Sequence, residues 1–155
     1  MSVSLKLEGL GDVVKVLKEL EAEIGDKALK SKILVPAVRE AMRPVLQAAI
    51  QNAPKDTGGL ARSMRIEARR PNRKDRRSKY VFSNDTVIAT VTTAPGKVLA
   101  KRGIKSDARA IAQEFGTAKH AAKPYMRPAL EANAQSVVDR LAKIILKRIE
   151  KFRKK

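Results

Sequence analysis

A long apolar stripe near the C-terminus constrains the fold more than any other feature of this sequence. Its members recur every three or four residues, the spacing that places side chains on one face of an α-helix. Pro128 suits the first turn of such a helix, which would extend roughly 40 Å at about 1.5 Å per residue. That is long for a domain of 155 residues. The stripe consists of Leu130, Ala134, Val137, Leu141, Ile144 or Ile145, Ile149 and Phe152.

Helical spacing also marks the N-terminal third of the chain. Apolar residues follow it over residues 10–24, where Gly25 stops the pattern, so we predict a helix there. A second helical region is predicted over about residues 27–52. Pro36 and Pro44 lie inside it, and each removes a backbone donor and crowds the preceding turn. We therefore expect a break or kink near one of them.

The apolar period changes from 3.6 to 2 in the middle of the chain. Alternation from Leu60 to Ala68 predicts a half-buried strand. Residues 80–82 and 86–92 are rich in β-forming types, and the Ser-Asn-Asp sequence at 83–85 is typical of a turn. These segments predict a β-hairpin.

The remaining segment before the long helix predicts one more short element. Residues 94–105 lack a period and are expected to be irregular. Ser106 can cap a short helix over residues 107–114, which Gly116 would end in the left-handed conformation. The order of elements predicts an α+β fold. We expect a single domain over residues 1–155, with a small antiparallel sheet packed with N-terminal helices and one long C-terminal helix.

Composition predicts a thin core and a chain without a membrane span. Twenty-two residues are alanine and none is tryptophan, so little apolar surface is available for burial. Either the isolated chain is marginally stable or neighbouring subunits supply further buried surface. There is no cysteine, which excludes disulfides and thiolate metal sites. No apolar run approaches the ~18 residues of a membrane span, and the N-terminus has no signal-peptide pattern, so we expect a soluble, unsecreted protein.

Positive charge is concentrated in two segments. The chain has 34 Lys and Arg against 16 Asp and Glu. Residues 62–79 hold nine basic and two acidic residues, and residues 143–155, the basic end of the long helix, hold seven and one. We predict an exposed, mobile loop over about residues 69–79 that contacts either DNA phosphates or an acidic protein. Its candidate contact residues are Arg69, Arg70, Arg73, Lys74, Arg76 and Arg77.

The sequence offers little for catalysis. His120 is the only histidine, so neither a Cys/His pair nor a histidine-rich metal cluster can form. Residues 93–98, Thr-Ala-Pro-Gly-Lys-Val, imitate the end of a phosphate-binding loop, but Val91 stands where its first glycine is needed. Val98 replaces the hydroxyl that would bind magnesium. We predict no enzymatic activity, no cofactor and no metal. A basic, aromatic-poor chain also fits a nucleic-acid-binding protein such as a ribosomal component.

Four short motifs in order carry a resemblance to a known family. Gly9-Leu10 precedes an amphipathic helix, and residues 53–60 read Ala-Pro-Lys-Asp-Thr-Gly-Gly-Leu before a strand. Residues 114–117 read Glu-Phe-Gly-Thr. Residues 124–129 read Pro-Tyr-Met-Arg-Pro-Ala, where the family has Pro-Phe-Leu-Arg-Pro-Ala. The chain thus resembles the head–tail joining, or tail-completion, proteins of long-tailed double-stranded DNA bacteriophages.

The resemblance implies a structural protein of the virion, assembled in the cytoplasm of the bacterial host. Such a protein would form a ring of about six copies at the head-proximal end of the tail. It would join the tail tube protein to the head connector, or stopper, around the channel that carries DNA. In this arrangement we expect a neighbouring subunit to cover part of the C-terminal stripe and of the 113–131 segment, although Tyr125 and Met126 could instead pack in the core. The candidate interface residues are Phe115, Tyr125, Met126, Arg127, Ile145, Ile149 and Phe152.

Overall fold

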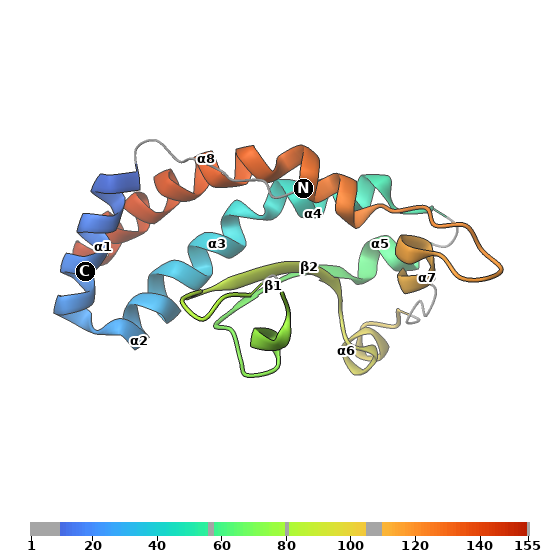
Figure 1. The fold of residues 1–155 in the computed structure, drawn as a ribbon, viewed down its shortest axis with the longest axis horizontal. Helices are drawn as coiled ribbons and strands as arrows, with labels where there is room; N and C mark the ends of the chain where they lie inside the picture. The colour runs from blue at the N-terminus through green and yellow to red at the C-terminus, as the bar shows by residue number, and fades with distance from the viewer. Residues whose placement is uncertain (1–9, 56–57, 80, 105–109, 155) are drawn as a thin grey trace. The chain divides into compact units, whose positions relative to one another are not determined.

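The computed structural model describes residues 10–55, 58–79, 81–104 and 110–154 (Figure 1). The chain forms two compact units, which are described separately below. Unit 1 contains the described residues of 1–41, 68–89 and 135–155. Unit 2 contains those of 42–67 and 90–134.

Unit 1 begins with helices that follow the sequence pattern closely. Helix α1 spans Leu10–Ile24, as predicted, and Gly25, with φ of 80°, separates it from α2 (Asp26–Leu29). A π-helical turn, η1 (Lys30–Leu34), leads into α3 (Val35–Ala41). Pro36 has no N–H for the helical ladder, which accounts for a local change of hydrogen-bonding pattern just before it.

The predicted break in the second helical region is confirmed. Helix α3 ends at Ala41, and α4 (Arg43–Asn52) starts after a turn at Met42. Pro44 lies in the first turn of α4, where its missing N–H costs nothing because no intrahelical acceptor is available there. The break also coincides with the boundary between the two units.

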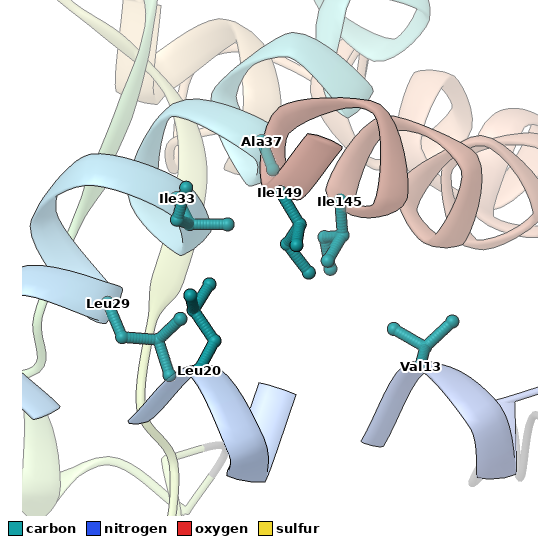
Figure 2. Packing of buried hydrophobic residues seen from close by; sticks show 7 residues of the cluster. All are labelled: Val13, Leu20, Leu29, Ile33, Ala37, Ile145 and Ile149. Carbon is teal, nitrogen blue, oxygen red and sulfur yellow. The ribbon is translucent and has the colours of Figure 1, made fainter. Parts of the chain in front are cut away.

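The core of unit 1 forms where α1, the α2–α3 region and the C-terminal half of α8 (Met126–Arg153) meet (Figure 2). Its side chains project from these three segments toward one another. An ion pair between Arg148 on α8 and Glu40 on α3, at 2.6 Å, lies at the edge of this packing. Both side chains are partly exposed, so the core is held mainly by apolar burial. The buried cluster consists of Val13, Leu20, Leu29, Ile33, Ala37, Ile145 and Ile149.

The sheet has two antiparallel strands, β1 (Met64–Arg69) and β2 (Ile88–Thr93). The predicted pairing of residues 80–82 with 86–92 is wrong, because β2 pairs with β1 instead. Phe82 lies in a turn and Tyr80 is outside the described residues. The predicted start of the first strand at Leu60 is also wrong, because Leu60 lies in the short helix α5.

Besides α4, the described residues of unit 2 form three shorter helices and the start of α8. Helix α5 spans Gly59–Ser63, and α6 (Gly96–Lys101) occupies the segment that we predicted to be irregular. Helix α7 covers Ala110–Phe115, whereas the predicted cap Ser106 and the first predicted helical residues lie outside the described part of the chain. The long C-terminal helix is confirmed as α8, whose 28 residues correspond to about 42 Å. The α+β class is likewise confirmed.

Candidate assembly site

Helix α7 buries a charged side chain and exposes its large apolar side chains, the reverse of an ordinary surface helix. Ala110 and Glu114, one turn apart, are buried, and Glu114 is only 9% exposed. Ile111 and Phe115, also one turn apart, are 74% and 66% exposed. Residues four apart share a helix face, so a carboxylate face is turned inward and a large apolar face outward. We call Ile111 and Phe115 the α7 apolar pair.

The buried carboxylate of Glu114 has a defined structural role. Its Oε2 accepts hydrogen bonds from the backbone N–H groups of Tyr125 and Met126, at 2.8 and 2.9 Å. Its Oε1 accepts one from the N–H of Arg127, at 3.0 Å. The first N–H groups of a helix have no partner within the helix, so Glu114 satisfies the start of α8 from eleven residues upstream. A negative charge at this end is also favoured by the helix dipole.

The protonation of Glu114 follows from these contacts. Burial of the carboxyl group raises its pKa, but the hydrogen bonds from the three N–H groups and the nearby Arg127 charge lower it by more in total. The net pKa lies below the ordinary value of 4.5. Glu114 is therefore ionised at neutral pH and acts as an anionic cap on α8.

The connection between α7 and α8 folds back on itself. Gly116 adopts the predicted left-handed conformation, with φ of 74°, and its N–H donates to the carbonyl of Ala112 at 2.8 Å. Thr117 and His120 exchange backbone hydrogen bonds, and the N–H of Lys123 donates to the carbonyl of Gln113 at 2.7 Å. These contacts and the Glu114 cap hold the two ends of the connection in place, so the α7 apolar pair sits on a fixed support.

Replacing Gly116 with alanine should destabilise the protein more than the same change at Gly58. Both glycines have left-handed φ angles, 74° and 66°, which cost an alanine roughly 1–2 kcal/mol. A Cβ at Gly116 would also come within 2.9 Å of the Ala122 backbone nitrogen, whereas one at Gly58 would meet nothing within 4 Å. We expect an additional loss of about 1–3 kcal/mol for Gly116→Ala. Urea unfolding of both variants measures this difference, and equal losses would show that the connection relaxes without cost.

The predicted interface residues separate into two groups. Tyr125, Ile145 and Ile149 are buried within the chain itself, the first in unit 2 and the other two in the core of unit 1. Phe152 is half-buried against that core, with the Lys32 ammonium 5.7 Å from its ring centre. The expectation that a neighbouring subunit covers Ile145 and Ile149 is therefore corrected, because α1 to α3 already cover them.

The surface-accessible candidates remain. Phe115 and Arg127 are exposed, and Met126 is partly exposed. The sequence reasoning missed Ile111, and it also missed the capping role of Glu114. The spacing in α7 contains a signal for both: Ile111 and Phe115 are four residues apart, and so are Ala110 and Glu114. Spacing alone does not say which of the two faces is buried.

The basic 69–79 segment is more structured than a mobile loop. Asp75 lies at its centre and accepts two hydrogen bonds from the Arg69 guanidinium, at 2.5 and 2.9 Å, and one from the Asn72 N–H. The Asn72 side chain in turn accepts from the N–H groups of Lys74 and Asp75, and a short 3₁₀ helix, η2 (Asp75–Arg77), follows. The Arg69 and Asn72 contacts lower the pKa of Asp75 to about 2, so it stays ionised across the physiological range.

Neither a metal site nor a membrane helix is found in the described residues. No group of three or more His, Asp or Glu side chains lies close enough there to hold a metal ion. Within the same ranges, no helix is both long and apolar enough to cross a bilayer.

Comparison with known proteins identifies the family. The model of the HK97-gp10-like family, described as "Bacteriophage HK97-gp10, putative tail-component", matches residues 14–94. This is 81 of the 155 residues and extends from α1 through β2. Neither the curated proteins nor the solved structures give a significant match. The chain belongs to the HK97-gp10-like family of bacteriophage tail components.

Proposed function

We propose that the chain is a non-catalytic structural protein that forms a ring of six copies at the head-proximal end of the tail. In this position it joins the tail tube to the head connector around the DNA channel. The family match supports a structural role in the tail. The motifs at 53–60, 114–117 and 124–129 support the more specific role in tail completion.

The α7 apolar pair is the observation that carries the self-association. Ile111 and Phe115 are among the most exposed large apolar residues of the described chain. Burying one such side chain is worth about 1.5–3 kcal/mol, so their exposure is a substantial unused contribution. Because Glu114 anchors the opposite face of α7 through α8, the pair cannot turn inward without losing three hydrogen bonds.

A second copy of the chain is the proposed occupant of this surface. In the proposed arrangement the pair meets a different patch on the next subunit. Such head-to-tail contacts close into a ring when repeated by rotation. A ring also provides the central channel that tail completion requires. Arg127 and Leu130, exposed on the first turns of α8, are further proposed members of the contact.

The double substitution of Ile111 and Phe115 by serine tests this proposal. We expect the variant to keep its far-ultraviolet circular dichroism spectrum, because both side chains are exposed, and to lose self-association by at least tenfold, about 1.4 kcal/mol per contact. Phe82→Ser is the matched control, since Phe82 is 65% exposed but lies in unit 1. Sedimentation velocity of both variants and the unaltered protein measures the oligomer mass. If the double variant assembles normally, the ring contact does not use α7.

A further inference from the structure

The 69–79 segment divides its cations into two classes. Arg69 is engaged with Asp75, and Arg70 pairs with Asp26 of α2 at 3.0 Å. The Arg76 guanidinium donates to the carbonyls of Phe82 and Ser83, both at 2.7 Å, and so ties the segment to the 82–85 turn. These three arginines hold the local fold. Of the six cations predicted to contact a partner, only the other three therefore remain candidates.

The other three cations point to a binding role. Arg73, Lys74 and Arg77 are exposed, and their side chains have no ion pair with any residue that the structure describes. They lie within five residues on a turn whose backbone is fixed by Asp75 and Asn72. Three positive charges within five residues repel one another, and anions bound beside them relieve the repulsion. We call these three residues the free cation triad.

We propose that the free cation triad binds the phosphates of duplex DNA without sequence preference. Phosphate binding requires cations and releases condensed counterions, and it needs no apolar contact. A stable contact with a protein usually centres instead on buried apolar and aromatic side chains. Residues 72–79 contain no apolar side chain, and Phe82 is the one exposed aromatic on the adjoining turn. That the phosphates belong to packaged DNA rests on the proposed position of the protein around the channel. That the triad binds phosphates does not depend on that position.

The backbone of this turn is fixed before a ligand binds, which favours affinity. A cation on a flexible loop loses conformational freedom when it binds, which lowers affinity. Here Arg69 and Asp75 fix the turn before any ligand is present, and the low pKa of Asp75, about 2, keeps that ion pair intact wherever DNA is stable. Asp75 is also neutralised by Arg69, so it does not oppose an incoming phosphate.

The test compares two triple variants with the same change in charge. One replaces Arg73, Lys74 and Arg77 with glutamine. The matched control replaces Lys147, Lys151 and Lys154 with glutamine. These are three exposed cations near the end of α8, in the same unit. The probe is a fluorescently labelled 30-base-pair duplex, and its binding is followed by anisotropy at several salt concentrations. Sedimentation velocity of each variant in parallel reports ring formation separately from DNA binding.

We expect the slope of log K against log salt to fall in magnitude by about 2–3 for the first variant, at about 0.9 per phosphate contact. The control should change the slope by less than about 1. Phe82→Ala should leave the slope unchanged, because phosphates offer an aromatic ring no contact. If the unaltered protein forms no ring but the slopes change as expected, the proposed function is contradicted and the phosphate site is still supported.

Two results would overturn the inference. Equal losses of slope in both triple variants would mean that net charge, and no local site, binds DNA. An unchanged slope in the first variant would mean that the triad does not contact phosphates. If purified tails carrying that variant also failed to join heads, the triad would bind an acidic protein instead.

Discussion

Ile149→Ala should lower the free energy of unfolding by about 2–5 kcal/mol, the range for removing a large aliphatic side chain from a packed core. Ile149 is 2% exposed and lies on the face of α8 that packs against α1, η1 and α3 (Figure 2). Alanine at this position leaves a cavity that those three segments cannot fill by side-chain movement alone. The thin, alanine-rich composition of the chain makes each large aliphatic residue of the core more important.

Leu146→Ala is the control for this prediction. Leu146 is on the same helix, one turn away, but is 38% exposed. Its truncation removes less buried surface, so we expect a loss of about 1 kcal/mol or less. Urea unfolding followed by circular dichroism gives both values. Equal losses would place Ile149 outside the core of unit 1.

Glu114→Gln should destabilise the protein by roughly 1.5–3 kcal/mol at neutral pH, the range for hydrogen bonds to a charged group. Glutamine keeps one acceptor oxygen where the carboxylate offers two. At least one of the three N–H groups of Tyr125, Met126 and Arg127 then loses its partner, and the favourable interaction with the helix dipole is lost as well. Glu131→Gln is the control, because Glu131 is an exposed carboxylate on α8, the helix that Glu114 caps.

The stabilisation from Glu114 should depend on pH in a defined direction. The folded protein holds the pKa of this carboxyl group below its ordinary value of 4.5, so the unfolded chain binds the proton more readily. The contribution is therefore fully present above about pH 4.5 and is lost as pH falls through the lower folded pKa. The difference in unfolding free energy between the unaltered protein and Glu114→Gln should shrink over that window. A difference that stays constant from pH 7 to pH 3 would contradict the anionic cap.

The helices could be predicted from the sequence because their signals are local. The bounds of α1 follow from apolar spacing ended by Gly25, and the break before α4 follows from the missing N–H of Pro44. The stripe of α8 predicted a long helix, since a period of 3.6 over 28 residues has no other regular explanation. The left-handed conformation of Gly116 could likewise be predicted, because glycine commonly adopts it just after the end of a helix.

The strand pairing and the assembly site depend on contacts between distant residues, which spacing does not encode. Local β propensity predicts that residues 86–92 pair with the nearest β-rich segment, whereas β2 pairs with β1 about twenty residues upstream. The Glu-Phe-Gly-Thr motif marked Phe115, but the inward face of α7 is decided by Glu114 meeting N–H groups eleven to thirteen residues away. Similarly, the stripe on α8 suggests an interface, because its spacing does not show that α1 to α3 cover Ile145 and Ile149.

Immunogold electron microscopy of purified phage particles tests the proposed role most directly. An antibody raised against the C-terminal end of α8 would be applied to complete particles and to tails released from heads. We predict that label lies at a single position, the junction between head and tail, and at one end of released tails. Label distributed along the tube, or confined to the end that meets the host cell, would contradict a role in joining the tail to the head.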